Sequence, residues 1–366
     1  MDKLFGGAYK GKKVLVTGHT GFKGSWLSFW LSELGADVVG YSIGIPTDPN
    51  HFRLLKPKIT GVTGDVLDKK KILETIKKHK PDIVFHLAAQ PIVRTSYLEP
   101  IKTLETNIMG TANVLESCRQ VKSVKAIVVI TSDKCYQNKE QIWGYRETDA
   151  MGGDDPYSAS KGAADLVAAT YRRSFFYPKD YGVKHNTLLA TVRAGNVIGG
   201  GDWAKDRLIP DIMRATSRRE TVVIRRPKAT RPWQHVLEPL SGYLNIGWKL
   251  LEEKTEFADN WNFGPDESSS LSVEEVIHHT KKHWSDIKYS IENDSSDFHE
   301  THLLKLDSTK AHIGLKWKNV WGSDKTFEKT VNWYKEYYKN KKCVTSKDLE
   351  EYVKDAKRLS IEWSIT

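Results

Sequence analysis

The chain has 366 residues, and its 39% hydrophobic and 10% aromatic content is enough to bury a large core. The 56 Lys and Arg residues outnumber the 46 Asp and Glu residues, and the net charge of +10 favours anionic partners such as nucleic acid or a phosphorylated metabolite. Three cysteines without metal-site spacing, a polar N-terminus without a signal-peptide core, and no apolar run of membrane-spanning length predict a reduced, cytoplasmic protein without metal or membrane contact.

Strands and helices alternate along the first half of the chain. Apolar strands are predicted at residues 13–17, 37–41, 59–64, 83–86, 125–130 and 186–192, and helices at residues 22–34, 68–79, 103–119 and 156–176. This alternation predicts right-handed crossovers in an α/β fold, a Rossmann-type doubly wound parallel sheet. We place a dinucleotide-binding domain at residues 1–194. Residues 195–366 would mainly form a smaller, mixed α/β substrate-binding lobe, with some segments able to return to the first domain.

A glycine-rich loop joins the first strand to the first helix. Glycine allows a tight turn and the close approach of a pyrophosphate, and the helix N-terminus offers free N–H groups. An ordinary βα turn is the alternative, but the strand–loop–helix context favours a dinucleotide site. The cofactor-binding candidates in this loop are Thr17, Gly18, His19, Gly21, Phe22, Lys23 and Gly24.

The end of the second strand leaves the choice between NAD and NADP open. It carries Tyr41 and Ser42 in place of the acidic residue that normally binds the adenosine ribose of NAD. Arg53 could meet a 2′-phosphate or be a surface charge. Asp65 could accept a hydrogen bond from the adenine amino group, or it could cap the helix that begins near Asp68.

Two short motifs carry candidate proton-transfer groups. Tyr157 and Lys161 lie four residues apart on one helix face, where an ammonium beside a phenol favours the phenolate and lets the tyrosine act as a base. Ser132, Asp133 and Lys134 follow the strand at residues 125–130, at the sheet edge where catalytic groups gather. Both motifs also have non-functional interpretations: Tyr157 and Lys161 could be a pair on a helix surface, and Asp133 and Lys134 could belong to a surface turn.

Together with Leu87-Ala88-Ala89-Gln90, these motifs are similar to extended short-chain dehydrogenase/reductases that act on nucleotide sugars. Segments 19–24, 151–158, 195–203 and 231–236 resemble the CDP-glucose 4,6-dehydratase branch, and the likeness spans residues 10–335. The pair Asp133-Lys134 matches that branch, whereas the related dTDP-glucose dehydratases carry Asp-Glu. The resemblance implies CDP-glucose as substrate, tightly bound NAD that is regenerated in each turnover, and a product that feeds deoxysugar synthesis for surface polysaccharide.

The resemblance also implies a role for each catalytic residue. Tyr157 would take the proton of the sugar C4 hydroxyl, which Ser132 would hydrogen-bond, while Lys161 would hold the nicotinamide ribose and keep Tyr157 acidic. Lys134 would remove the C5 proton, and Asp133 would protonate the departing C6 hydroxyl. These roles require Lys134 to be neutral while Asp133 is protonated, the reverse of the usual states of the two side chains at neutral pH. A proton transferred between Asp133 and Lys134 would remove this conflict.

Further binding residues follow from the same resemblance. Those expected at the cofactor, besides the glycine loop, are Tyr41, Ser42, Asp65, Val66, Leu87, Ala88, Ala89, Gln90, Asn107, Tyr157 and Lys161. Those expected at the substrate are Gln90, Arg94, Ser132, Asn196, Arg207, Arg231 and His235, because arginine binds two phosphate oxygens at once. Some candidates have alternatives: surface cations for Arg207, Arg225 and Arg226, and core packing for His235, Trp203, Trp233 and Trp261.

Other functions are also open at this stage. A 4-epimerase would share Tyr157 and Lys161 but would not use Asp133 and Lys134. A non-catalytic NAD-binding regulator or an RNA-binding protein would be non-enzymes. Against these, every catalytic position is filled and no aromatic-rich recognition strand or zinc spacing appears. Helices 103–119 and 156–176 resemble the pair that packs against a partner subunit in this family, so we expect a homodimer or a dimer of dimers.

Overall fold

A computed structural model describes residues 1–224, 227–266, 269–292 and 303–365 of the chain. Its largest sheet is parallel and consists of β1 Lys13–Thr17, β2 Asp37–Ser42, β3 Thr60–Thr63, β4 Ile83–His86, β5 Ala126–Ile130, β6 Leu188–Ala194 and β10 Asn260–Phe263. The seven strands lie in the order β10-β6-β5-β4-β1-β2-β3. This parallel sheet, with crossovers to both sides of β1, confirms the predicted doubly wound α/β class.

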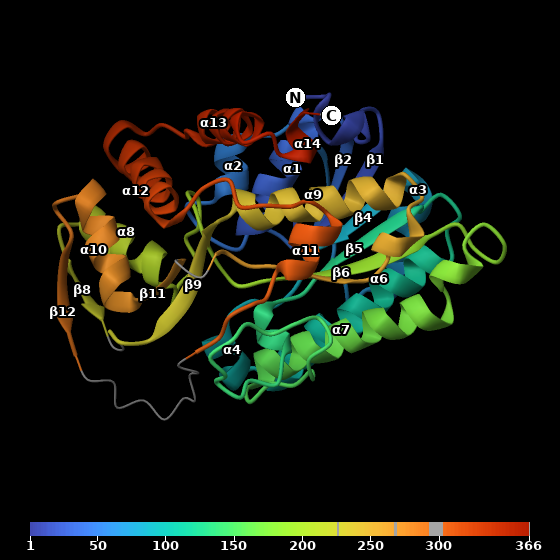
Figure 1. Ribbon diagram of the computed structural model, residues 1–366, viewed down its shortest axis with the longest axis horizontal. Helices are drawn as coiled ribbons and strands as arrows, with labels where there is room; N and C mark the ends of the chain where they lie inside the picture. Colours follow the sequence, from blue (N-terminus) through green and yellow to red (C-terminus); the bar gives the residue numbers. More distant parts are fainter. Residues whose placement is uncertain (225–226, 267–268, 293–302, 366) are drawn as a thin grey trace.

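Neighbouring residues of each central strand pack against opposite layers of helices. In β1, Leu15 belongs to one apolar cluster, while Val14 and Val16 belong to another. The first layer contains α3 Lys69–His79, α6 Gly110–Arg119 and α7 Pro156–Ser174; the second contains α1 Phe22–Glu33, α9 Leu237–Leu251, α11 Thr309–Gly314, α13 Thr345–Arg358 and α14 Glu362–Ile365. Burial on both faces explains why these strands are continuously apolar (Figure 1).

The helix predicted at residues 103–119 is divided into three parts. It begins as α5 Pro100–Leu104, continues as a π-helical turn, η2 Glu105–Met109, and ends as α6. Such π-helical turns are frequent at functional sites because they redirect a side chain. Here the turn carries Asn107, one of the predicted cofactor-binding residues.

The chain after β6 contributes to both parts of the molecule. Strands β7 Asn196–Ile198, β9 Thr230–His235 and β11 Ser270–Ser272 form a three-stranded sheet, and β8 Thr221–Ile224 pairs with β12 Lys288–Ile291. These small sheets pack with α8 Leu208–Ser217, α10 Val273–His283 and α12 Ser323–Asn340 beside the large sheet (Figure 1). By contrast, β10 pairs with β6 in the large sheet, and α9 covers that sheet.

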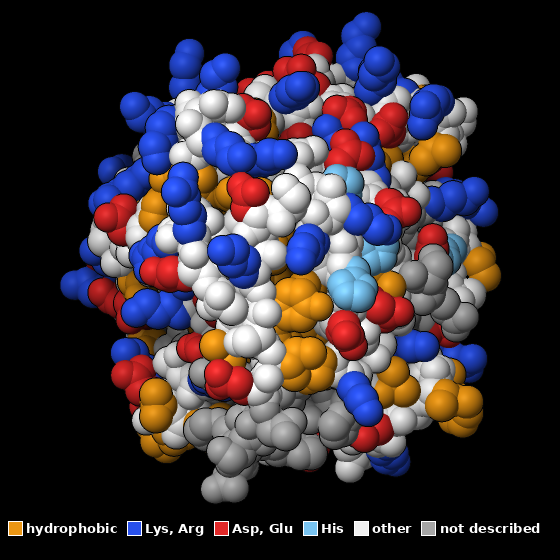
Figure 2. Space-filling model, turned by 90° about the vertical axis from the view of Figure 1, so that its left-hand side faces the viewer, with side chains coloured by type: hydrophobic (Ala, Val, Ile, Leu, Met, Phe, Trp, Pro, Cys, Tyr) orange, Lys and Arg blue, Asp and Glu red, His pale blue; other side chains and the backbone are white. Residues whose placement is uncertain are grey.

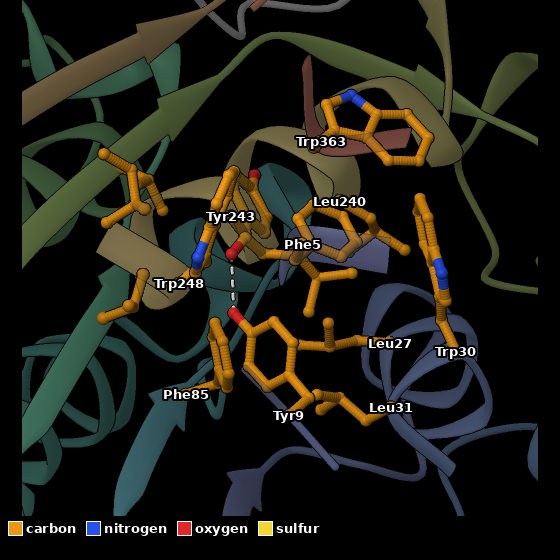
Figure 3. Packing of buried hydrophobic residues seen from close by; sticks show 14 of the residues in the cluster. Phe5, Tyr9, Leu27, Trp30, Leu31, Phe85, Leu240, Tyr243, Trp248 and Trp363 are labelled. Atoms are coloured by element: carbon orange, nitrogen blue, oxygen red, sulfur yellow. Dashed lines mark hydrogen bonds between the residues drawn. The ribbon is translucent and has the colours of Figure 1, made fainter. Parts of the chain in front are cut away.

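The two ends of the chain pack together over the layer that contains α1 and α9. The short turn η1 Leu4–Gly7 places Phe5 on the ring of Trp363, with ring centroids 5.0 Å apart. Tyr9 donates a hydrogen bond of 2.6 Å to the Leu244 carbonyl (Figure 3). Fully buried aromatic side chains provide large apolar contact areas, so the C-terminal helices are part of the main core.

The charge of the chain is spread over its surface. On the face seen in Figure 2, Lys and Arg side chains alternate with acidic ones and do not form a continuous basic strip. A dispersed pattern of this kind is typical of solvated helix faces. Within the described residues, no helix has the length and apolar character needed to cross a bilayer.

Candidate active site

A cavity of about 520 Å³ lies at the carboxyl ends of β5 and β6, between the large sheet and the smaller lobe. This is the edge at which open α/β sheets bind ligands. The predicted residues that line it are Phe22, Lys23, Arg94, Ser132, Asp133, Lys134, Tyr157, Asn196, Arg207 and Arg231. The sequence motifs of the two halves of the chain therefore meet in one cavity.

The glycine loop has the geometry that a pyrophosphate needs. Gly18 has a φ of +76°, and a β-carbon at this position would come within 2.9 Å of the Ala88 nitrogen. A β-carbon at Gly24 would collide with the Gly18 carbonyl. The N-cap of α1 is Gly21, which has no side chain to satisfy the first N–H groups of the helix. An anionic phosphate group fits this end of the helix.

The adenosine end of the predicted cofactor site contains no acidic residue at the end of β2. Ser42 Oγ lies 2.9 Å from His19 Nδ1, and the Tyr41 hydroxyl donates to the Asp65 backbone carbonyl. Asp65 is exposed and accepts a bond from the Leu67 N–H, while the cap of α3 is Asp68. Asp65 is therefore not the helix cap, and its carboxylate faces solvent beside buried Val66.

Asn107 ties the segment after β4 to the catalytic helix. Its side-chain carbonyl accepts from the Gln90 N–H at 2.8 Å, and its amide donates to Ser160 Oγ at 2.8 Å. Ser160 lies between Tyr157 and Lys161 on α7. The Gln90 side chain bonds Ile92 and Thr103 and is not among the residues that line the cavity, unlike most of the other predicted substrate-binding residues.

Ser132 and Asp133 follow the carboxyl end of β5. Asp133 begins a short helical turn, η3 Asp133–Cys135, and Ser132 is the N-cap of that turn. The Ser132 hydroxyl donates to Asp133 at 3.0 Å and caps the turn by accepting from the Lys134 N–H. Burial raises the pKa of Asp133, although Lys134 and Ser132 oppose this effect. Desolvation thus favours the protonated form of Asp133, which the predicted role as an acid beside Lys134 requires.

Tyr157 and Lys161 are buried one turn apart near the start of α7. The helix begins where Asp155 accepts from the Ser158 N–H, which places Tyr157 in its first turn. Burial raises the pKa of Tyr157 to about 12, and burial lowers the pKa of Lys161 to about 8. The largest influences that lower the pKa of Tyr157 are Ser132 and Arg207, not the predicted Lys161.

A buried ion pair supports this wall of the cavity. Arg193 on β6 donates through Nε and Nη2 to the two carboxylate oxygens of Asp165 on α7, both at 2.9 Å. Asp165 also accepts from Thr131 at 2.9 Å, directly before Ser132. Both members of the pair are almost fully buried. The two-pronged geometry fixes the end of β5 relative to the catalytic helix.

The opposite wall holds cations. Arg207 pairs with Asp202 at 2.8 Å, and Arg231 on β9 reaches the same cavity. Arg94 also lines the cavity, but it comes from α4 Val93–Leu98, which packs against α7, and it pairs with Asp206 at 3.4 Å. These arginines surround a space suited to an anionic diphosphate, whose oxygens match the guanidinium fork.

Lys23, like its neighbour Phe22, differs from the rest of the glycine loop in lining this cavity. Burial lowers the pKa of Lys23 to about 8, with a further contribution from Arg207.

The remaining candidates are one histidine, three tryptophans and two arginines, and most of those that the structure describes do not line the cavity. His235 is fully buried between Trp26 and Trp321, its Nδ1 accepts from the Leu237 N–H, and it does not line the cavity, which favours the core alternative over the predicted substrate role. Trp203 and Trp261 also pack in the core, whereas Trp233 lines the cavity while remaining mostly buried. Arg225 and Arg226 lie outside the described residues.

Several residues of the site have no counterpart in the sequence prediction. Asp202 and Asp206 orient two of the arginines, and Tyr97 joins the cavity lining. His86 connects Thr17 on β1, at 2.7 Å, to Thr111 on α6. The partners of Asp206 and His86 are far away in the sequence, so no local pattern marks these two residues.

A phosphate loop on the first βα unit, joined to a buried Tyr–Lys pair on a later helix, defines a dinucleotide-dependent enzyme of the extended short-chain dehydrogenase/reductase class. More narrowly, residues 15–330 match the family model described as GDP-mannose 4,6 dehydratase, and the chain belongs to this family. The matched region ends before α13.

Individual relatives agree with this assignment. A protein from Salmonella typhimurium named CDP-glucose 4,6-dehydratase is 48% identical over 357 residues, which cover 96% of this chain and 98% of that protein. The fold resembles the solved epimerase Mth375 from Methanothermobacter thermautotrophicus, with a TM-score of 0.77 and 23% identity over 91% of this chain and 95% of that one. It also resembles a dTDP-glucose 4,6-dehydratase from Streptomyces venezuelae solved with NAD, with a TM-score of 0.73 and 21% identity over 88% and 97% of the two chains.

Proposed function

We propose that this protein converts CDP-D-glucose to CDP-4-dehydro-6-deoxy-D-glucose and water, as a hydro-lyase that supplies deoxysugar synthesis for surface polysaccharide. The observation that carries the proposal is the meeting of Asp133, Lys134 and Tyr157 in one cavity with a ring of arginines. The full-length similarity to a relative that is named for this reaction supports the nucleotide assignment.

Bound NAD would supply a reversible hydride acceptor for the oxidation at C4 and the reduction at C6, so no cofactor would be consumed in a turnover. The residues that would hold it are the glycine loop, with Asp65 and Val66 at the adenine end and Lys161 at the nicotinamide ribose. We expect it to stay with the enzyme between turnovers. Gel filtration followed by measurement of protein-bound nucleotide tests this retention.

The chain itself supplies the proton transfers. Tyr157 takes the proton of the C4 hydroxyl, and Ser132 holds that oxygen by a hydrogen bond. Oxidation at C4 acidifies the C5 hydrogen, which Lys134 removes. Asp133, whose pKa burial raises, gives its proton to the C6 hydroxyl as water departs. The elimination thus needs an acid and a base on the same wall of the cavity.

The lobe wall would hold the nucleotide diphosphate. Arg231, Arg207 and Asn196 line the same cavity as the catalytic groups and come from the chain after β6. Charge-assisted bonds from arginine to phosphate place the sugar at the other end of the substrate, against β5 and α7.

We also propose a homodimer formed through the layer of α7. Leu98 and Ile101 are 79% and 66% exposed, and Met109 and Leu166 lie exposed on adjoining elements of this layer. A second copy of this face would cover these apolar side chains. Sedimentation velocity should give a dimer for the native chain and a monomer for Ile101→Asp.

Incubation with a panel of sugar nucleotides tests the proposed reaction. The purified protein receives NAD and, in separate tubes, CDP-glucose, dTDP-glucose, UDP-glucose and GDP-mannose, and mass spectrometry follows the loss of one water. We expect water loss from CDP-glucose. Water loss from a different nucleotide alone would contradict the CDP assignment, and appearance of the C4 epimer without water loss would contradict the dehydratase.

A further inference from the structure

A chain of buried hydrogen bonds connects the C-terminal helix α13 to the first turn of α1. His51, on the short helix α2 His51–Leu55, lies 2.7 Å through Nδ1 from Ser25 Oγ and 2.8 Å through Nε2 from Thr345 Oγ1. Trp333 Nε1 donates to the same Thr345 oxygen at 2.9 Å, and Ser25 donates to the Phe22 carbonyl at 2.8 Å. All four bonds are short enough to be formed together.

The two end bonds of this chain have fixed directions, and the neutral state of the buried His51 sets the directions of the two between them. An indole N–H can only donate and a backbone carbonyl can only accept. Trp333 therefore donates to Thr345, Thr345 to His51 Nε2, His51 Nδ1 to Ser25, and Ser25 to Phe22. This order requires a neutral imidazole protonated on Nδ1, and burial lowers the pKa of His51 to about 3.

Tight packing holds His51 in this position. Its ring lies 5.1 Å from Trp26 and 5.6 Å from Trp333, and it is fully buried. A β-carbon at Gly201 would collide with the ring. Because the packing leaves the His51 ring little room to move, a shift of Thr345 would displace His51 and, through it, the first turn of α1.

The segment that carries His51 also braces the phosphate loop. Asn50 Nδ2 donates to the Thr20 carbonyl at 3.0 Å, and the Thr20 hydroxyl donates to the Gly44 carbonyl at 2.6 Å. Phe52 packs against the ring of His19, with centroids 4.9 Å apart. Residues 44–52 thus lie on the glycine loop from one side, and α13 holds them from the other.

We propose that α13 belongs to the cofactor site, with Thr345 and His51 as positioning residues that set the first turn of α1 and the phosphate loop for the NAD pyrophosphate. Neither residue lines the substrate cavity. Their loss should therefore weaken the dinucleotide and leave the sugar nucleotide unaffected. The inference rests on the proposed NAD cofactor, but it does not depend on which sugar nucleotide is turned over.

Direct titration of the full-length protein, freed of nucleotide, with NAD tests this role. Thr345→Val keeps the shape of the side chain but removes its hydrogen bonds with His51 and Trp333, together with the 3.4 Å contact to Cys343 Sγ, and we expect the Kd for NAD to rise about tenfold. Thr345→Ser should restore it. The KM for the sugar nucleotide and kcat at saturating NAD should stay near the native values.

Asp355→Ala provides the matched control. It removes a bond of 3.0 Å from Trp321 to the other end of the same helix, away from His51. It should lower Tm as Thr345→Val does, without changing the Kd for NAD. Equal Tm losses with an unchanged Kd in both variants would overturn the proposal and leave α13 a purely structural element. If the native chain binds NAD but does not dehydrate CDP-glucose, the proposed function fails while this Kd comparison still decides the inference.

Discussion

The two walls of the cavity differ in whether their surroundings disfavour or stabilise the charged forms of their side chains. On the wall formed by β5 and α7, burial is the largest influence on the pKa of Asp133, of Tyr157 and of Lys161, and in each case it disfavours the charged form. On the lobe wall, Asp202 raises the pKa of Arg207, and a guanidinium keeps its charge throughout the working pH range. One wall is built for groups that exchange protons, and the other for a fixed positive charge.

This contrast assigns different kinetic signatures to the two walls. Loss of a proton-transfer group should lower the rate of the chemical step with little change in binding. Loss of a fixed cation should raise KM, because diphosphate binding is nearly the same in the ground state and the transition state. Substitutions on the two walls, taken from the largest expected effect to the smallest, can break or sharpen this division.

The largest effect is expected for Tyr157→Phe. Removal of the phenol removes the base for the C4 hydroxyl, and we expect kcat to fall about 1,000-fold. The Kd for CDP-glucose, measured by calorimetry, should change little. A large rise in Kd with an unchanged kcat would place Tyr157 among the binding residues and abolish the contrast between the walls.

Asp133→Asn should have the next largest effect, with kcat lower by about 100-fold. Because burial raises the pKa of Asp133, its protonated form persists to higher pH than that of an exposed carboxyl. Activity of the native enzyme should therefore fall as the pH rises through this pKa, and the asparagine variant should lose that alkaline limb. A pH–kcat profile of both proteins measures this, and an identical limb in the two would exclude Asp133 as the acid.

On the lobe wall, Arg231→Ala should raise KM for CDP-glucose about tenfold, because one charge-assisted contact to phosphate is lost. Arg231→Lys keeps the charge but not the fork, so we expect an intermediate KM. In both variants kcat should remain within about threefold of the native value. Steady-state kinetics at several substrate concentrations separates the two constants, and a fall in kcat alone would contradict a binding role.

Arg94→Ala should have the smallest effect. Its ion pair with Asp206 is 39% and 44% exposed, and exposed pairs contribute little. We expect KM to change by less than about threefold. A loss as large as that of Arg231→Ala would show that Arg94 contacts the diphosphate directly.

The sequence predicts the central sheet and most of the catalytic wall because their signals are local. The spacing of apolar residues along the sequence predicts the strands and helices. The catalytic candidates form two short motifs, Tyr157 with Lys161 and Asp133 with Lys134, whose members lie within a few residues of each other. The supporting contacts join distant residues and leave no such signal. Arg193 lies 28 residues from Asp165, and His51 lies 294 residues from Thr345.

His235 shows the opposite case. A histidine in a motif shared with a family was expected at the substrate, yet its side chain is fully buried against aromatic rings and is not among the residues that line the cavity. A motif identifies the neighbourhood of a site, but it does not show how far along the strand the cavity lining extends. In β9 the cavity receives Arg231 and Trp233, and His235 continues the strand beyond the cavity lining.

The most direct test of the account is a single turnover of Lys134→Ala with CDP-glucose and one equivalent of NAD, followed by the absorbance of reduced nicotinamide and by mass spectrometry of the sugar nucleotide. If Lys134 is the base at C5 and Tyr157 acts independently at C4, the variant should oxidise C4 and accumulate reduced nicotinamide, with no loss of water. The native enzyme should lose water and retain little reduced nicotinamide. Water loss from the variant at the native rate would contradict the assignment of Lys134 and, with it, the acid–base wall proposed here.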